Sequence, residues 1–232
     1  MKILPFGAVA AVLALSGCAS VSVKNIERHA QAAQPPAVIY LQDYDTRGGN
    51  WKITSRSRTP EQFKGEVAEL LSKNLAADLE GFLHVPVHRV GSRKDLPPNG
   101  WLVTGRFIRV SEGNPAGRIL FGLGIGSSKV ETETIVFDGR SRGAILQFAT
   151  TGGSNAYPGA LISSGPASSV ISGVSQAMRG VNDDTKRTAR MVTASMAEFE
   201  AEKGWIKPSS LKPKKPGQFQ ILQPQTASGK LF

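Results

Sequence analysis

The order of strand-like and helix-like segments predicts an α+β domain, with a mixed β-sheet of about five strands and helices packed mainly on one face. Two observations lead to this fold class. An apolar run is followed by an amphipathic helical pattern and then by several β-rich segments, and two further helical patterns close the domain. The predicted domain covers residues 37–205, which is long enough to bury an adequate core.

Residues 1–17 have the pattern of a lipoprotein signal peptide. Lys2 supplies the positive charge, Ile3 to Leu15 is apolar, and Leu15-Ser16-Gly17-Cys18 matches a lipobox. The apolar run is too short for a stable membrane-spanning helix. We therefore expect cleavage before Cys18 and lipidation of its thiol, with palmitate among the chains; an ordinary signal peptide with an incidental cysteine is the alternative.

The mature chain is expected to be anchored by lipid at Cys18, its only cysteine, so no internal disulfide can form. Each buried acyl methylene contributes about 0.8 kcal/mol, and two or more chains make attachment stable. Ala19 after the cysteine is similar to the outer-membrane sorting pattern. The expected location is the cell outer membrane, facing the periplasm, with residues 18–36 as a lipidated tether.

The domain begins with a short strand, Ala37 to Tyr44, followed after a basic loop by a strong helix start. Thr59 is placed as the N-cap, Pro60 at the first helical position and Gln62 as the second half of a capping box. The inner face of this helix should be Phe63, Val67, Leu70, Leu71, Leu75 and Leu79, and Gly81 should end it.

A strand from Phe82 to Val90 is expected next, and it contains His84 and His88. This spacing binds zinc on a helix, but on a strand it separates the side chains by roughly 13 Å. No metal site and no cofactor are therefore expected.

The centre of the domain is the stretch Trp101 to Asp138. Apolar residues of both parities predict a central strand over Leu102 to Val110, and a second strand covers Lys129 to Phe137. The segment Ala144 to Thr151 is expected to pair with the second strand as a hairpin across a turn at Arg140 to Gly143.

Glycines lie at alternate positions before the second of these strands, at Gly122, Gly124 and Gly126, with Ser128 after them. In an extended chain they would leave a bare backbone groove on one face, suited to close packing, a bulge or contact with a ligand. The spacing lacks the phosphate-loop ending and the third glycine of a dinucleotide fingerprint. A possible binding groove of Gly122, Gly124, Gly126 and Ser128 is thus one hypothesis, and a purely structural role is the other.

The same residues carry a family resemblance. Gly113-Asn114, Arg118 and the alternating glycines up to Val130 resemble the signature of the Gram-negative lipoprotein family catalogued as domain of unknown function 4410. The likeness extends loosely over residues 36–205. It implies a periplasm-facing lipoprotein and an architecture, and it carries over no catalytic residue.

Two helices should complete the domain, one from Pro166 to Val181 and one capped by Asp183 or Asp184. Gly204 should end the second helix, with Trp205 against Phe199 in a Schellman contact. Residues 206–232 are rich in Pro, Lys and Gln and are expected to be a disordered basic tail.

The pattern of residues favours a binding or assembly module for an envelope protein or cell-wall polymer. The net charge of +10 suits anionic envelope surfaces, and the periplasmic address argues against nucleic acid. A hydrolase of an envelope polymer is one alternative, but the chain has no G-x-S-x-G elbow, and Glu131 and Glu133 lie next to Lys129 like solvated strand residues. We therefore expect no enzyme. A subunit of a self-assembling envelope or secretion complex is the other alternative, and the oligomeric state stays open.

Overall fold

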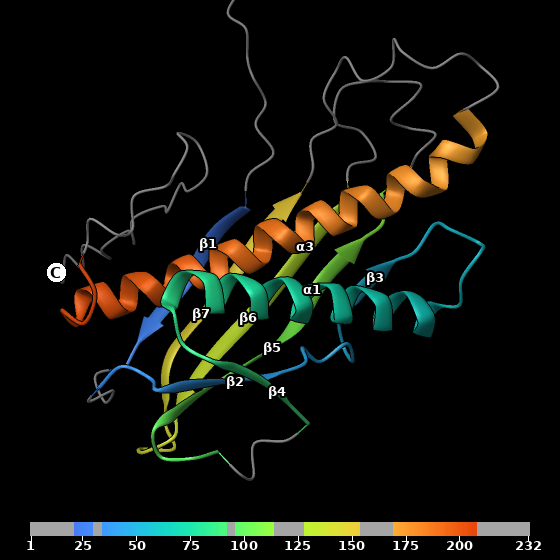
Figure 1. Cartoon of the computed structure of the whole chain (residues 1–232). Helices are drawn as coiled ribbons and strands as arrows, with labels where there is room; N and C mark the ends of the chain where they lie inside the picture. The colour runs from blue at the N-terminus through green and yellow to red at the C-terminus, as the bar shows by residue number, and fades with distance from the viewer. Residues whose placement is uncertain (1–20, 30–33, 92–95, 114–127, 154–168, 208–232) are drawn as a thin grey trace, which may run out of the picture.

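The computed structural model describes residues 21–29, 34–91, 96–113, 128–153 and 169–207. They form one mixed seven-stranded sheet with two helices packed against one face, so the predicted α+β class is confirmed (Figure 1). Two strands more than expected are present. The elements are β1 (Val21–Arg28), β2 (Val38–Gln42), β3 (Asn50–Lys52), α1 (Pro60–Leu83), β4 (Val87–Val90), β5 (Gly100–Ser111), β6 (Lys129–Asp138), β7 (Ala144–Gly153) and α3 (Ser169–Glu202).

The sheet has an antiparallel half and a parallel half. Its strand order is β1-β7-β6-β5-β2-β4, with β3 paired to β5 beyond the end of β2. Pairs among β1, β7, β6 and β5 are antiparallel, whereas β2 pairs in parallel with β5 and β4. Helix α1 connects β2 to β4, as a parallel neighbour requires a crossover. The predicted hairpin of β6 and β7 is confirmed.

Helix α1 begins where the sequence predicts and ends later. Thr59 accepts a hydrogen bond from the backbone of Gln62 (3.2 Å), and the Gln62 side chain accepts one from the Thr59 backbone (2.9 Å). Gly81 does not end the helix, which continues to Leu83; His84 is the left-handed cap, at φ 57°. One glycine costs a helix only about 1 kcal/mol, whereas Pro86 disfavours helical backbone at the residue before it. The predicted strand 82–90 is accordingly reduced to β4.

Helix α3 is one continuous helix, so the two-helix prediction was wrong. Asp184 does not cap a new helix but is buried inside α3, where it accepts a hydrogen bond from Ser128 (2.7 Å) and pairs with Arg187 (2.9 Å). The predicted end of the helix is confirmed. The backbone of Trp205 donates to the carbonyl of Glu200 (3.0 Å), and Gly204 has φ 76°. The ring of Trp205 lies 6.3 Å from that of Phe199.

Strand β1 corrects the tether prediction. Residues 21–28 pair antiparallel with β7 at the edge of the sheet, so this part of the segment 18–36 belongs to the folded domain. Val23 is only 2% exposed, and Arg28 forms an ion pair with Glu202 at the end of α3 (2.8 Å). A register shift between Lys24 and Glu27, with Asn25 at φ 53°, interrupts the alternation of apolar residues and hides the strand from a search for period-two patterns.

The two faces of the sheet differ in how deeply their side chains are buried and in whether helices cover them. On β6, every second side chain is buried, from Val130 to Asp138, and the two valines Val130 and Val136 belong to the apolar core on the side of α1 and α3. The alternate residues point to the other face, which no described helix covers (Figure 1). No described helix is long and apolar enough to cross a membrane.

Candidate functional site

Most of the site residues predicted from sequence lie outside the described residues. Cys18 is one of them, as are Gly122, Gly124 and Gly126. Ser128 is described, and it is fully buried. Its hydroxyl donates to Asp184 of α3, so it joins the beginning of β6 to the helix. The lipidation site and the glycine groove both remain predictions.

The two histidines considered for a metal site have different surroundings. His84 caps α1, whereas His88 lies on β4 with its ring 6.0 Å from that of Tyr40. Within the described part of the chain, no group of three or more His, Cys, Asp or Glu side chains could hold a metal ion.

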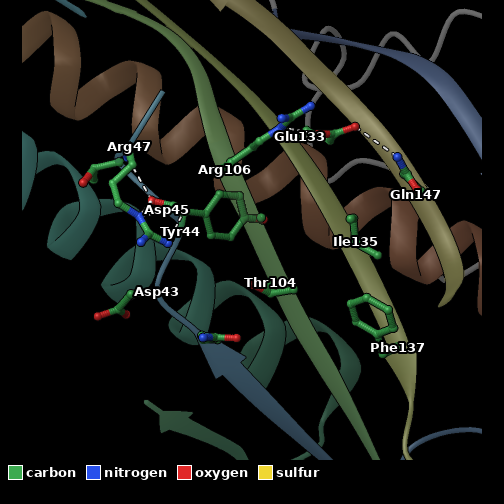
Figure 2. Close-up of a pocket in the computed structure, with 13 residues that line it drawn as sticks. Asp43, Tyr44, Asp45, Arg47, Thr104, Arg106, Glu133, Ile135, Phe137 and Gln147 are labelled. Atoms are coloured by element: carbon green, nitrogen blue, oxygen red, sulfur yellow. Dashed lines mark hydrogen bonds and ion pairs between the residues drawn. The ribbon is translucent and has the colours of Figure 1, made fainter. Parts of the chain in front are cut away.

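A hollow of about 870 Å³ lies on the sheet face that points away from the helices (Figure 2). Cross-strand pairs place its floor residues beside one another on three adjacent strands. They have the opposite parity to the buried residues Val103, Thr134, Val136 and Phe148. The floor consists of Thr104 and Arg106 from β5, Glu133, Ile135 and Phe137 from β6, and Gln147 from β7.

The segment that follows β2 forms one wall of the hollow, over residues 42–47. Asp45 attaches this wall to β5, because its backbone donates to Gly105 (2.9 Å) and accepts from Phe107 (3.0 Å). Arg47 folds back onto the Asp45 carboxylate with its Nε and Nη2 atoms. Hydrogen bonds from the Arg47 side chain hold the pKa of Asp45 below its usual value. The wall therefore has a defined position against the sheet.

Tyr44 anchors the wall in the core. Its hydroxyl lies 2.7 Å from that of Thr134, and burial raises the pKa of this phenol well above its ordinary value. The ring crosses over Gly105, where a Cβ atom would collide with the Glu133 carbonyl and come within 2.5 Å of the Tyr44 ring. Only glycine at position 105 allows this close passage.

Every carboxylate of the hollow is paired with a cation. Glu133 accepts from Arg106 Nε (2.5 Å) and from Gln147 Nε2 (3.0 Å), as Figure 2 shows for the latter pair. Asp45 is bound by Arg47, and Asp43 accepts from Arg89 (2.9 Å). No His, Cys or Ser is among the described residues that line the hollow. The described lining residues therefore offer hydrogen-bonding groups and apolar contact.

The sequence indicated only fragments of this site. In the sequence, Arg47 lies in the basic loop after the first predicted strand, and Glu133 has the pattern of a solvated strand residue. The neighbours of Glu133 are set by the register of β5 against β6 and of β6 against β7. The alternation of polar and apolar residues on β6 could have identified a two-sided strand, but it does not reveal which residue lies opposite which.

The fold and the hollow define a class: a sheet covered by helices on one face, with a polar, ion-paired hollow on the other. The chain belongs to the family described as domain of unknown function DUF4410, whose model matches residues 39–227. The predicted membership of this family is thereby confirmed, whereas the lipoprotein nature that the resemblance implies stays a prediction. The match continues past residue 205 into the segment predicted to be a tail.

Solved structures that are similar to this chain include the following two. One is the PelC dodecamer from Paraburkholderia phytofirmans, with a TM-score of 0.36, 11% identity, and coverage of 72% of this chain and 96% of that one. The other is a Xanthomonas campestris protein of family DUF330, with a TM-score of 0.39, 12% identity, and coverage of 78% and 97%. A search of curated proteins found no match.

Proposed function

We propose that this protein is an outer-membrane-anchored periplasmic lipoprotein that binds an envelope partner in the hollow on the open face of its sheet. The lipobox ending at Cys18 supports the anchor, because its diacylglycerol chains would hold the domain at the membrane. The observation that carries the binding role is the hollow itself, with polar side chains from three strands held in place on a surface that no described helix covers.

Binding without catalysis fits this site best. The carboxylates of the hollow are held by cations, and hydrogen bonds from Arg47 keep the pKa of Asp45 low, so that group is a poor proton donor near neutral pH. A rigid sheet that carries side chains already fixed by ion pairs is suited to recognition, since little order is lost on binding.

The anchor is tested by metabolic labelling with radioactive palmitate. The wild-type chain should be labelled and recovered in the outer-membrane fraction, whereas Cys18→Ala should remain unlabelled. A labelled Cys18→Ala variant, or wild-type protein free of label in the periplasmic fraction, would contradict the anchor.

The docking surface is tested by photo-crosslinking in intact cells. A photoreactive phenylalanine analogue replaces Thr104 on the floor of the hollow, and the control replaces the exposed Lys73 on α1. Adducts of reproducible size from position 104, and none from position 73, are expected. Equal adduct patterns at the two positions, or none at position 104, would argue against the hollow as the docking surface.

A further inference from the structure

Only a short piece of chain separates the predicted anchor from the sheet. Strand β1 begins at Val21, three residues after Cys18. Three residues span at most about 10 Å, even when they are fully extended. Because β1 is paired into the sheet, acyl chains on Cys18 would keep one end of the sheet within about 10 Å of the lipid headgroups.

The strand register identifies this end of the sheet, which we call the anchor-side end. Val21 pairs with Gly152 in β7, and the last residues of β7 lie beside the start of β6. Lys129, the first residue of β6, pairs with Ser111 of β5, and Ser111 pairs on its other side with Lys52 of β3. Figure 1 shows β1 starting at the end of the sheet to which the arrowheads of β5 and β7 point.

Basic side chains gather on the open face at the anchor-side end. Lys52, Arg109 and Lys129 lie in two adjacent rows of the sheet, and Glu131 is the one carboxylate in these rows. The exposed fraction of the side chain is 46% for Arg109 and 39% for Lys129, but only 13% for Glu131. Lys52 is exposed as well. The three cations therefore project into solvent, whereas the carboxylate lies between them at the surface of the sheet.

The excess of positive charge continues into the next row of the open face. There, Arg106 and Lys24 are exposed, and Glu133 is the acidic residue between them. Asp45 lies beside Arg106, but Arg47 pairs with it, so these two residues add no net charge. Among the described residues, the half of the open face nearest the anchor thus carries more cations than carboxylates.

Other acidic residues do not offset this charge on the open face. Glu112, which directly follows β5, is fully buried, and two backbone N–H groups after β3 donate to its carboxylate (2.9 and 2.8 Å). The described acidic side chains of α1 and α3 belong to the helical layer on the other side of the sheet (Figure 1). An anionic surface that approaches the open face at its anchor-side end therefore meets mainly Lys52, Arg109 and Lys129.

On these grounds we propose that Lys52, Arg109 and Lys129 rest on the anionic lipid headgroups of the membrane that holds Cys18. This inference rests on the proposed function, because the anchor brings these residues to the membrane. The Debye length is about 8 Å at physiological ionic strength, so charges held within about 10 Å of a bilayer still interact with it. Each Lys or Arg near an anionic surface strengthens binding about fivefold.

The contact also sets the direction in which the hollow faces. Glu133 on its floor lies four residues along β6 from Lys129, which is about 13 Å, and Ile135 lies about 20 Å away. The hollow is therefore held off the lipid and stays open to the periplasm. Lipid contact and partner binding use different parts of the same face.

The test measures binding of the mature chain, residues 18–232, to lipid vesicles. The chain carries Cys18→Ala, so that no acyl group contributes. Co-sedimentation compares phosphatidylethanolamine vesicles that contain about 30% phosphatidylglycerol with vesicles of phosphatidylcholine. We expect binding to the anionic vesicles only, weakening at least about tenfold between about 50 and 300 mM salt. Equal binding to both kinds of vesicle, or binding to neither, would overturn the inference.

A pair of matched double variants locates the contact. Lys52→Ala with Arg109→Ala should weaken binding to the anionic vesicles at least about tenfold, and it leaves Lys129 to pair with Glu131 (2.7 Å). Lys73→Ala with Arg140→Ala removes the same two charges from exposed positions on α1 and at the opposite end of the sheet, and it should bind within about twofold of the parent chain. Circular dichroism verifies that both are folded. Equal weakening would mean that net charge alone drives binding, and would refute this site.

A gain of binding gives a test that unfolding cannot imitate. Asn50 is exposed and pairs in register with Arg109, so Asn50→Lys should strengthen binding to the anionic vesicles about fivefold. Unchanged or weaker binding would contradict the contact. Soluble polygalacturonate is the competing anionic polymer. If it bound as tightly as the vesicles and also required Lys52 and Arg109, the surface would belong to a polymer and the membrane contact would be refuted.

The outcomes separate this inference from the proposed function. Palmitate labelling of Cys18 without vesicle binding by the Cys18→Ala chain would leave the anchor standing and refute the lipid contact. Vesicle binding that requires Lys52 and Arg109, with no palmitate on the wild type, would support the contact and refute the anchor. Crosslinking at position 104 tests the hollow independently of both.

Discussion

The same strands form both faces of the sheet, but the two faces carry different kinds of side chain. On the covered face, large apolar side chains meet α1 and α3, and the buried hydroxyls of Thr132 and Thr150 are paired with each other at 2.7 Å. On the open face, the alternate residues form ion pairs around a hollow. Stability should therefore depend on the first face and recognition on the second, although adjacent residues of β5 and β6 serve both.

The largest difference in stability is expected between two truncations on β5, one of a buried apolar side chain and one of an exposed apolar side chain. Trp101 is 1% exposed and packs against Phe199 and Trp205, with ring centres 6.0 Å from each. Trp101→Ala should lower the free energy of unfolding by about 3–5 kcal/mol. Ile108 is 41% exposed on the same strand, so Ile108→Ala should cost less than about 1 kcal/mol. Urea unfolding followed by circular dichroism measures the free energy of unfolding of both variants. Similar losses in the two variants would contradict the conclusion that stability depends on the covered face.

The next test uses a pair of glycines. At Gly105, an added methyl group would strike the Glu133 carbonyl and the Tyr44 ring, so Gly105→Ala should destabilise the fold by about 1–3 kcal/mol. At Gly65, on an exposed part of α1, a Cβ would meet nothing within 4 Å, and Gly65→Ala should stabilise by about 0.5–1 kcal/mol. Thermal unfolding distinguishes these opposite signs. A neutral Gly105→Ala variant would mean that Tyr44 does not hold the wall of the hollow against β5.

The parts that the sequence predicts well are those encoded by neighbouring residues. The capping box of Thr59 and Gln62 and the Schellman contact of Trp205 are local patterns, and both occur as predicted. Strand β1 was missed because its bulge breaks the local alternation. The break expected at Asp184 was wrong because a distant residue, Ser128, accommodates this carboxylate inside the fold.

The hollow could not be predicted for the same reason. Arg106 and Glu133 are 27 residues apart, and only the register of β5 against β6 brings them together. The sequence shows that one is basic and the other acidic, but a one-residue slip in register would place each of them beside a different neighbour. The proposed binding role of this face depends on pairing between strands, whereas most of the core depends on patterns within each element.

A buried acid on the covered side gives a pH test. Burial raises the pKa of Glu200 to about 7, and its Oε1 atom has no hydrogen-bond partner among the described residues. In the unfolded chain this carboxyl ionises near its ordinary pKa, so the folded state binds more protons between that pKa and about 7, and stability should fall as the pH rises through this window. Glu200→Gln should remove most of this fall, which we expect to be about 1–3 kcal/mol between pH 5 and pH 8.

The measurement is urea unfolding of wild type and Glu200→Gln at a series of pH values. Ala77→Gln, at an exposed position of α1, introduces the same side chain without removing a carboxylate, and it serves as the control that should keep the pH dependence of the wild type. If Glu200→Gln and wild type lose stability in parallel, other groups are responsible for the pH dependence.

The smallest effect is expected for the ion pair that organises the open face. Arg106 is 65% exposed and Glu133 is 21% exposed, so water and salt weaken their attraction, and ordering the two side chains offsets part of what remains. A double-mutant cycle with Arg106→Ala, Glu133→Ala and the double variant should give a coupling energy below about 1 kcal/mol that decreases in high salt. The same variants should nevertheless weaken ligand binding, because Arg106 and Gln147 depend on Glu133 for their positions. A coupling of several kcal/mol would make this pair part of the structural framework, and the division of labour between the two faces would then be wrong.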